Sequence, residues 1–297
     1  MPAQRLLDPR VLNRISTIEL VAKTVVDGFV AGLHRSPYFG FSQEFAEYRP
    51  YVPGDDPRFV DWNVFARTER TYLKRYLGET NTALVLLFDA SNSMGFGSKD
   101  GVTKIEYARF LAASLAYMAL HQHDAVSLIL YDEKVRRYLP PSTRPGQLNG
   151  LLHAIEQAQP AAKTDVDQPF EHFRQFHNKR SLVAVISDFY FSPDRILKAV
   201  RPLCYHGNDI ILFHVLDPAE LNPQLGDSTL LEDMETGERM EVAPEYAQTE
   251  YRRLIQSHIE DLRREARGSG ADYLLLDTSL PLDAALKEYL LFRQKRM

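Results

Sequence analysis

Five short apolar runs, separated by helix-length segments, constrain the fold of this chain more than any other sequence feature. They occupy residues 83–88, 125–132, 181–188, 209–217 and 272–277. The run 83–88 is continuously apolar and the others are mostly so, which is typical of a strand that is covered on both faces in a parallel sheet. Strands that alternate with helices in this way form a doubly wound sheet with helices on both sides. We therefore predict an α/β fold with a mostly parallel, Rossmann-type doubly wound sheet.

The segments between these runs carry the signals of helix starts. Thr103 and Glu106 have the spacing of a capping box. The predicted helix behind them extends to about His121 and is apolar almost all round, so we expect other elements to cover it on several sides. Further predicted elements are a short strand at 135–139, helices at 145–158, 167–177 and 193–205, an inserted β-hairpin at 229–242, a helix from Pro244 to about Gly268, and a last helix at 281–293.

The first 80 residues differ in composition from the rest, so we predict two parts: an N-terminal extension, residues 1–80, and the doubly wound domain, residues 81–297. Within the extension, apolar residues recur at intervals of three and four over residues 11–34, which predicts one helix. Ser16 and Glu19 have capping-box spacing near its start.

Residues 35–80 are dense in aromatic side chains and contain Pro50, Pro53 and Pro57. Prolines at this frequency interrupt helices, so we predict short strands and turns, with GDDP at 54–57 as the main turn. Asp55, Asp56 and Asp61 with Arg58 are interpreted as turn residues at 55–56 and an Arg–Asp ion pair, rather than as a catalytic cluster.

Charge and composition exclude several classes of function. The chain has 35 Lys and Arg against 40 Asp and Glu, a net charge of -5, so it lacks the basic field with which nucleic-acid-binding proteins neutralise phosphate. A single cysteine, Cys204, suits a reducing compartment and cannot form a cysteine metal cage. The longest apolar stretch, Phe110 to Leu120, is about half of the roughly 20 residues that a membrane span needs. We expect a soluble, cytoplasmic protein without a membrane span.

Oxygen-bearing side chains gather at the predicted strand ends. Asp89, Ser91 and Ser93 follow the first strand on alternate residues, Asp188 ends the third, and Thr164 lies in a loop before a helix. The carboxyl ends of parallel strands meet at one edge of the sheet, where ligands of such folds bind. Carboxylate and hydroxyl oxygens are the ligands of a hard cation, and Mg²⁺ fits best, although Mn²⁺ and Ca²⁺ accept the same ligands.

This order of motifs resembles the metal-ion-dependent adhesion site of von Willebrand A domains. The likeness lies in Asp89-x-Ser91-x-Ser93, then Thr164, then Asp188 at the end of an Ile-Ser-Asp strand. The upstream segment FAEYRPYVPGDDPRFVDWNVFART is similar to a bacterial domain-of-unknown-function family that carries a von Willebrand A core. Members are commonly encoded beside MoxR-type AAA+ ATPases. Asn92 stands where von Willebrand A domains often have glycine, and we expect little consequence because it is not a ligand position.

The resemblance implies a role for each site residue. Ser91 and Ser93 would bind the metal directly, Asp89 and Asp188 directly or through water, and Thr164 according to the conformational state. Such a site leaves one coordination position for an acidic residue of a partner protein. The resemblance thus implies a non-enzymatic binding module, an adaptor or co-chaperone for a MoxR-type AAA+ ATPase.

Two other hypotheses stay open at this point. Asp89 and Asp188 at adjacent strand ends would also suit a magnesium-dependent hydrolase or phosphoryl-transfer enzyme, for which Lys99, Lys104 and Lys163 are the candidate phosphate ligands. Alternatively, the metal site is vestigial and the aromatic extension, with Trp62, Tyr72 and Tyr76, forms an oligomerisation surface.

Overall fold

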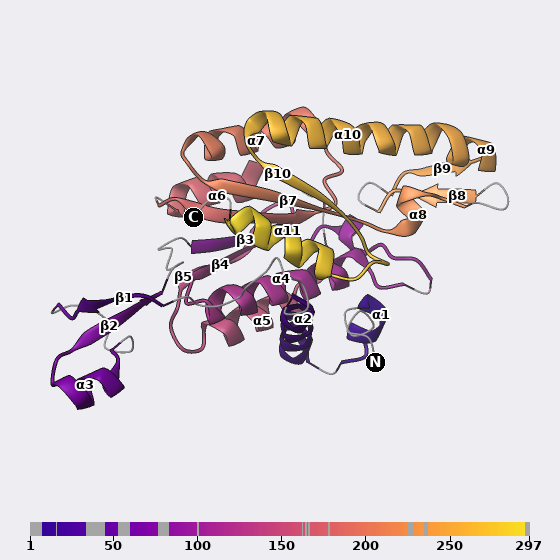
Figure 1. The fold of residues 1–297 in the computed structure, drawn as a ribbon. Helices are drawn as coiled ribbons and strands as arrows, with labels where there is room; N and C mark the ends of the chain where they lie inside the picture. The colour runs from indigo at the N-terminus through magenta and orange to yellow at the C-terminus, as the bar shows by residue number, and fades with distance from the viewer. Residues whose placement is uncertain are drawn as a thin grey trace.

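A six-stranded sheet between two layers of helices forms the body of the protein (Figure 1). The computed structural model describes residues 8–15, 17–33, 45–52, 60–76, 83–99, 101–161, 163, 165, 167–177, 179–224, 229–234 and 237–294. Within these residues no helix is both long and apolar enough to cross a membrane.

The sheet has the strand order β10-β7-β6-β3-β4-β5. Its strands are β3 (Ala83–Asp89), β4 (Val126–Tyr131), β5 (Val135–Ser142), β6 (Ser181–Ser187), β7 (Asp209–Leu216) and β10 (Asp272–Asp277). All neighbours pair in parallel except β5, which runs antiparallel to β4 at the edge. Because β5 has only one neighbour, its two prolines cost no central ladder hydrogen bonds. The predicted α/β fold class with a mostly parallel, doubly wound sheet is confirmed.

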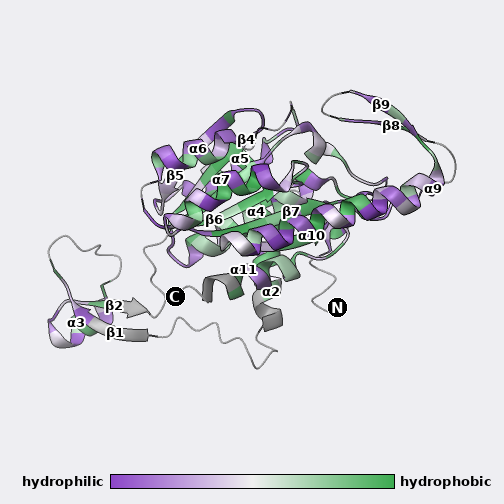
Figure 2. Ribbon diagram, turned by 90° about the horizontal axis from the view of Figure 1, so that it is seen from above, coloured by the Kyte–Doolittle hydropathy of each residue, from purple (hydrophilic) through white to green (hydrophobic). Residues whose placement is uncertain are grey.

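Helices cover both faces of the sheet, and its strands are the most apolar part of the chain (Figure 2). One layer contains α2 (Ile18–Leu33), α4 (Lys104–His121), α5 (Gln147–Glu156) and α11 (Asp283–Gln294), and the other contains α6 (Asp167–Phe176), α7 (Pro193–Tyr205) and α10 (Arg252–Ser269). The α4 helix packs against the sheet and also against α2, α5 and α11, so most of its residues are buried. This confirms the sandwiched helix that the sequence predicts, and the Thr103–Glu106 capping box is present.

Two helices occupy the region in which the sequence predicted one helix, residues 11–34: α2 confirms most of that helix, but its predicted first turns are wrong. The first, α1 (Pro9–Leu12), is capped by Asp8, whose side chain accepts a hydrogen bond from the backbone of Arg10. The chain then turns, and α2 begins after Thr17, whose Oγ1 accepts a hydrogen bond of 3.3 Å from the Leu20 N–H. Ser16, the predicted cap, lies outside the described residues. The apolar periodicity continues across the break, which hides it in the sequence.

The N-terminal extension contains the helix α3 (Trp62–Thr68), where strands and turns alone were predicted. The Asp61 carboxylate caps α3 by accepting hydrogen bonds of 2.9 and 3.2 Å from the backbone N–H groups of Asn63 and Val64. The prolines precede this helix rather than interrupt it. The predicted turn at 54–57 lies outside the described residues.

Two antiparallel strands of the extension, β1 (Phe45–Pro50) and β2 (Tyr72–Tyr76), form a separate sheet beside α3. Figure 1 shows this small unit to one side of the main sheet. The predicted hairpin near the C-terminus is also present as β8 (Thr229–Glu232) and β9 (Arg239–Val242). It is followed by the short helix α9 (Pro244–Tyr246) and a π-helical turn at Ala247–Tyr251 that leads into α10.

Candidate metal-binding site

The chain changes direction across the sheet between β3 and β6. From β3 it adds β4 and β5 on one side, and then returns to place β6 and β7 on the other side. In an open α/β sheet this switch point leaves a crevice outside the carboxyl ends of the two strands. Asp89 is the last residue of β3 and Asp188 directly follows β6, so the fold brings these two predicted site residues to the same edge of the sheet, at this switch point.

Asp89 is fully buried and held at both carboxylate oxygens. Its Oδ1 accepts a hydrogen bond of 2.9 Å from the Ser91 N–H, and its Oδ2 accepts one of 2.6 Å from the Ser187 hydroxyl. Burial, and then the negative charge of Asp188, raise the pKa of Asp89 to about 7, against the opposing effect of hydrogen bonds from Ser187 and Ser91. A cation placed near Asp89 would therefore stabilise its ionised carboxylate by a strong electrostatic attraction. Ser187 was missed in the sequence, where it reads as an ordinary strand residue.

Ser91 and Ser93 follow Asp89 on a loop that continues into a 3-10 turn at Asn92–Gly95. Their hydroxyl oxygens are 3.1 Å apart. Ser91 is buried, and the buried Met94 side chain anchors the turn in the apolar core. The loop thus presents two hydroxyls beside the Asp89 carboxylate.

Thr164 lies outside the described residues, but its loop is fixed on both sides. The Ala161 N–H donates a hydrogen bond of 3.0 Å to the Ala90 carbonyl, next to Asp89. The Asp165 N–H donates another of 3.0 Å to the Asp132 carbonyl after β4. The chain on either side of Thr164 is therefore attached to the loops that follow β3 and β4.

A buried lysine shares this site. Lys104 is the first residue of α4 and is 0% exposed. Its Nζ lies 2.7 Å from Asp188 Oδ2 and 2.6 Å from Glu220 Oε1. Burial alone would lower the pKa of Lys104, but the charges of Asp188 and Glu220 outweigh it and raise the pKa, so the side chain stays an ammonium. Its position directly after the Thr103 cap was visible in the sequence, but its partners were not.

Because Lys104 is enclosed among carboxylates, it is not exposed for the phosphate contact that the hydrolase hypothesis needs. The other two candidates, Lys99 and Lys163, are exposed. The buried Lys104 ammonium is thus paired with Asp188 and Glu220.

Aromatic rings complete the surroundings of Lys104. Its Nζ lies 4.8 Å from the centre of the Tyr190 ring and 5.9 Å from that of Phe96. The side chains of Glu220 and Tyr251 lie close enough to Tyr190 to influence its pKa. Burial, followed by the charge of Glu220, raises the pKa of Tyr190. This network connects the site to the π-helical turn before α10.

An aspartate also stands at the end of each of the three other parallel strands, and all three aspartates have structural roles. Asp132 pairs with Arg136 at 3.3 Å. Asp217 caps α8 (Pro218–Leu221) and accepts hydrogen bonds from the Ser98 loop. Asp277 accepts from the backbone and hydroxyl of Ser279. Since these three aspartates are occupied by other contacts, Asp89 and Asp188 are the two strand-end carboxylates that lie at the switch point.

The donor set fits a hard divalent cation. Within the described part of the chain, no three His, Cys, Asp or Glu side chains cluster as a metal site, so any metal here would need hydroxyl ligands. Asp89, Ser91, Ser93 and Asp188 supply two carboxylates and two hydroxyls at one crevice, as Mg²⁺ and Mn²⁺ accept. The Lys104 ammonium is the feature that alters the charge balance of this set.

The β8–β9 hairpin contacts the loop of the site. The Asn92 side-chain amide donates a hydrogen bond to the Met234 carbonyl, which lies just after β8. Asn92 therefore has a structural role that the sequence did not indicate. Four apolar side chains of the hairpin and its turn are exposed: Leu230, Leu231, Met234 and Met240.

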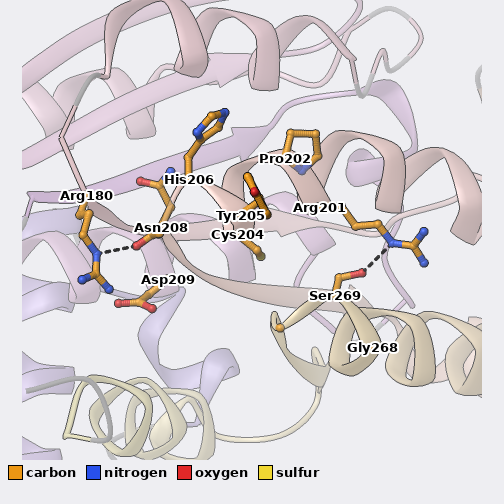
Figure 3. A pocket seen from close by; sticks show the side chains of 12 residues that line it. Arg180, Arg201, Pro202, Cys204, Tyr205, His206, Asn208, Asp209, Gly268 and Ser269 are labelled. Atoms are coloured by element: carbon orange, nitrogen blue, oxygen red, sulfur yellow. Dashed lines mark hydrogen bonds between the residues drawn. The ribbon is translucent and has the colours of Figure 1, made fainter.

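A pocket of about 710 Å³ lies at the opposite edge of the sheet, at the amino ends of β6 and β7 (Figure 3). Both arginines of the pocket form hydrogen bonds with the protein itself. Arg180 Nε donates one of 2.8 Å to the Gly207 carbonyl, and Arg201 Nε donates one of 3.2 Å to Ser269 Oγ. The pocket contains none of the predicted site residues.

Comparisons with known proteins agree with this architecture. A family model described as "Protein of unknown function DUF58" matches residues 47–265. Two relatives, from Mycobacterium tuberculosis and Mycobacterium bovis and both described as uncharacterized proteins, are each 27% identical over 276 residues, which is 91% of this chain and 86% of the relative.

Among solved structures, the conserved hypothetical protein BatB from Bacteroides thetaiotaomicron aligns with a TM-score of 0.50 and 16% identity, covering 72% of this chain and 99% of that chain. The SpRpn10 VWA domain aligns with a TM-score of 0.44 and 10% identity, covering 71% and 95%. Together with the strand order, the likeness to BatB agrees with the predicted doubly wound α/β fold. Likenesses at this identity concern the fold alone.

Proposed function

The chain belongs to the DUF58 family of proteins of unknown function, and from this premise we propose that it is a metal-ion-dependent protein-binding module. The observation that carries the proposal is the meeting of Asp89, Ser91, Ser93 and Asp188 at the switch point of the sheet. Thr164, whose neighbours Ala161 and Asp165 are hydrogen-bonded to the loops after β3 and β4, is proposed as the fifth residue.

The chemistry of these residues favours binding over catalysis. A divalent cation held by neutral hydroxyls and few carboxylates stays electrophilic, so a carboxylate from another protein gains a strong interaction with it. Among the described residues of the crevice, the serine hydroxyls contact each other and Asp89 rather than a histidine base. We propose that the partner presents an aspartate or glutamate to the metal.

For the partner, we propose a MoxR-type AAA+ ATPase, with this chain as its adaptor or co-chaperone in the cytoplasm. The support is the resemblance of the segment from Phe45 to Thr68 to the family commonly encoded beside such ATPases. The confirmed fold and the family membership are consistent with that resemblance.

Metal binding is tested by the thermal stability of the full chain. A ligand of the folded state stabilises it by about 2.7 kcal/mol at a concentration of 100 times its Kd. We therefore expect MgCl₂ to raise the Tm of the native protein, and NaCl at equal ionic strength not to do so. The Ser91→Ala/Ser93→Ala variant should lose the response. If neither Mg²⁺ nor Mn²⁺ changes the Tm of the native protein, metal binding is refuted.

Partner binding is tested by affinity capture from the native cell with Mg²⁺ or with EDTA. We expect a AAA+ ATPase to be recovered only with Mg²⁺, and not by Asp89→Ala. The matched control is Asp277→Asn, which changes a strand-end aspartate outside the crevice. Equal recovery by Asp89→Ala and the native chain would contradict the proposal.

A further inference from the structure

The buried ammonium of Lys104 lies against one of the proposed metal ligands. It is 0% exposed and lies between two carboxylates, at 2.7 Å from Asp188 and 2.6 Å from Glu220. Asp188 is 1% exposed. One of the proposed metal ligands is thus already paired with a cation of the chain itself.

Lys104 is fixed where it is by its place in the fold. It directly follows the cap Thr103, whose backbone and side chain are both engaged with Glu106. The Lys104 N–H donates a hydrogen bond of 2.9 Å to the Phe96 carbonyl, which ties it to the loop that carries Ser91 and Ser93. The ammonium therefore belongs to the framework of the site.

The charges explain why a cation is needed there. Asp188 and Glu220 both contact the ammonium, and the charge of Asp188 also acts on the buried Asp89 and on Glu220. Without a positive charge these acids would repel one another in a medium that screens poorly. Lys104 offsets this repulsion in the absence of any metal, but its charge also repels an incoming dication.

We propose that Lys104 is the resident counter-cation of the metal site: it holds Asp188 in place without metal and weakens the binding of a divalent cation. The proposal rests on the metal binding proposed above. It assigns to one residue both the stability of the empty site and a modest metal affinity of the protein alone.

The test is a titration of the full chain with Mn²⁺, in which free Mn²⁺ is followed by electron paramagnetic resonance. Lys104→Met keeps the length of the side chain and removes the charge. We expect it to bind Mn²⁺ at least about tenfold more tightly than the native chain, and to have a lower Tm without metal. Lys198→Met, which removes an exposed lysine of α7, should match the native chain in both measurements.

A second variant covers the case in which Lys104→Met does not fold, as far-UV circular dichroism would show. Lys104→Met/Glu220→Gln removes one positive and one negative charge, so the net charge of the site is unchanged. Asp188 is then the one acid that loses its ion pair with Lys104. We expect this double variant also to bind Mn²⁺ more tightly than the native chain, because Asp188 is released from its pairing.

The outcomes separate this inference from the proposed function. If native and variant chains bind Mn²⁺ equally, or the variants bind more weakly, metal binding stands and the role of Lys104 is overturned. If only the variants bind, the role of Lys104 is supported and the metal dependence of the native chain fails. If none binds, both proposals are overturned.

Discussion

The Ser187 hydroxyl donates a hydrogen bond of 2.6 Å to Asp89 Oδ2 and thereby joins the ends of β6 and β3. Both residues are 0% exposed, and they are 98 positions apart in the chain. The same hydroxyl accepts a hydrogen bond of 3.0 Å from the Phe189 N–H, the residue after Asp188. Ser187 therefore sets the relative placement of the two aspartates on which the proposed site depends.

Ser187→Ala should destabilise the protein by about 1–3 kcal/mol, because it leaves a buried carboxylate oxygen without its donor. Denaturation in urea measures this as a lower midpoint at unchanged slope. Ser181→Ala, at the start of the same strand, is the control. Its hydroxyl donates 3.1 Å to the Lys179 carbonyl, a neutral acceptor, so we expect a smaller loss. Equal losses would mean that the Asp89 contact has no special weight.

Gly97→Ala should destabilise the loop between the site serines and α4. A Cβ at this position would lie 2.8 Å from the Thr103 Cα and 3.1 Å from its N, and backbone atoms cannot rotate away. We expect a cost of about 1–3 kcal/mol, measured by thermal or urea unfolding. Gly101→Ala is the matched control, since the nearest atom to its added Cβ is 3.5 Å away. A native-like Gly97→Ala would contradict the close approach of this loop to the helix start.

The buried His214 should make the protein sensitive to acid. Its Nδ1 and the Tyr273 hydroxyl share a hydrogen bond of 2.7 Å, and its Nε2 has no hydrogen-bond partner. Burial, and then the charges of His258 and Lys104, lower the pKa of His214 to about 3. The unfolded chain binds this proton at a pKa of about 6.5, so stability is lost as the pH falls from about 6.5 towards 3.

At pH 5 this histidine alone should account for about 2 kcal/mol of lost stability relative to neutral pH. His214→Phe removes the titrating group, so the free energy of unfolding should change less between pH 7 and pH 5 than in the native chain. The comparison uses the pH dependence of each protein, which cancels the packing cost of the substitution. An unchanged dependence would show that His214 does not bind its proton preferentially in the unfolded state.

Trp62 is the only tryptophan of the chain, and it is 60% exposed at the start of α3, with its ring edge-on to Phe65 at 5.9 Å. Its fluorescence should therefore be quenched by iodide nearly as well as free indole, and Trp62→Phe should change stability by less than about 0.5 kcal/mol. An indole that is shielded from iodide in the native protein would instead agree with the oligomerisation hypothesis. Size-exclusion chromatography with light scattering would then show the larger species.

Local sequence signals determined the regular elements of the sheet and the helix starts. The short, mostly apolar runs predicted the five parallel strands, because a strand covered on both faces consists mainly of apolar residues. Thr103 and Glu106 are only three positions apart, so their capping box can be predicted directly from the sequence. The helix α3 was missed because its signal, the cap Asp61, is short and lies among prolines and aromatics.

Only the tertiary structure decided which polar residues meet. Aspartates follow all five parallel strands, and nothing local separates Asp89 and Asp188 from the three that cap helices, form turns or pair with arginine. The position of β3 and β6 side by side makes that choice. Lys104 meets Asp188 across 84 positions and Glu220 across 116. Such contacts follow from the crossover connections that set the strand order, and a single sequence carries no periodic pattern that records them.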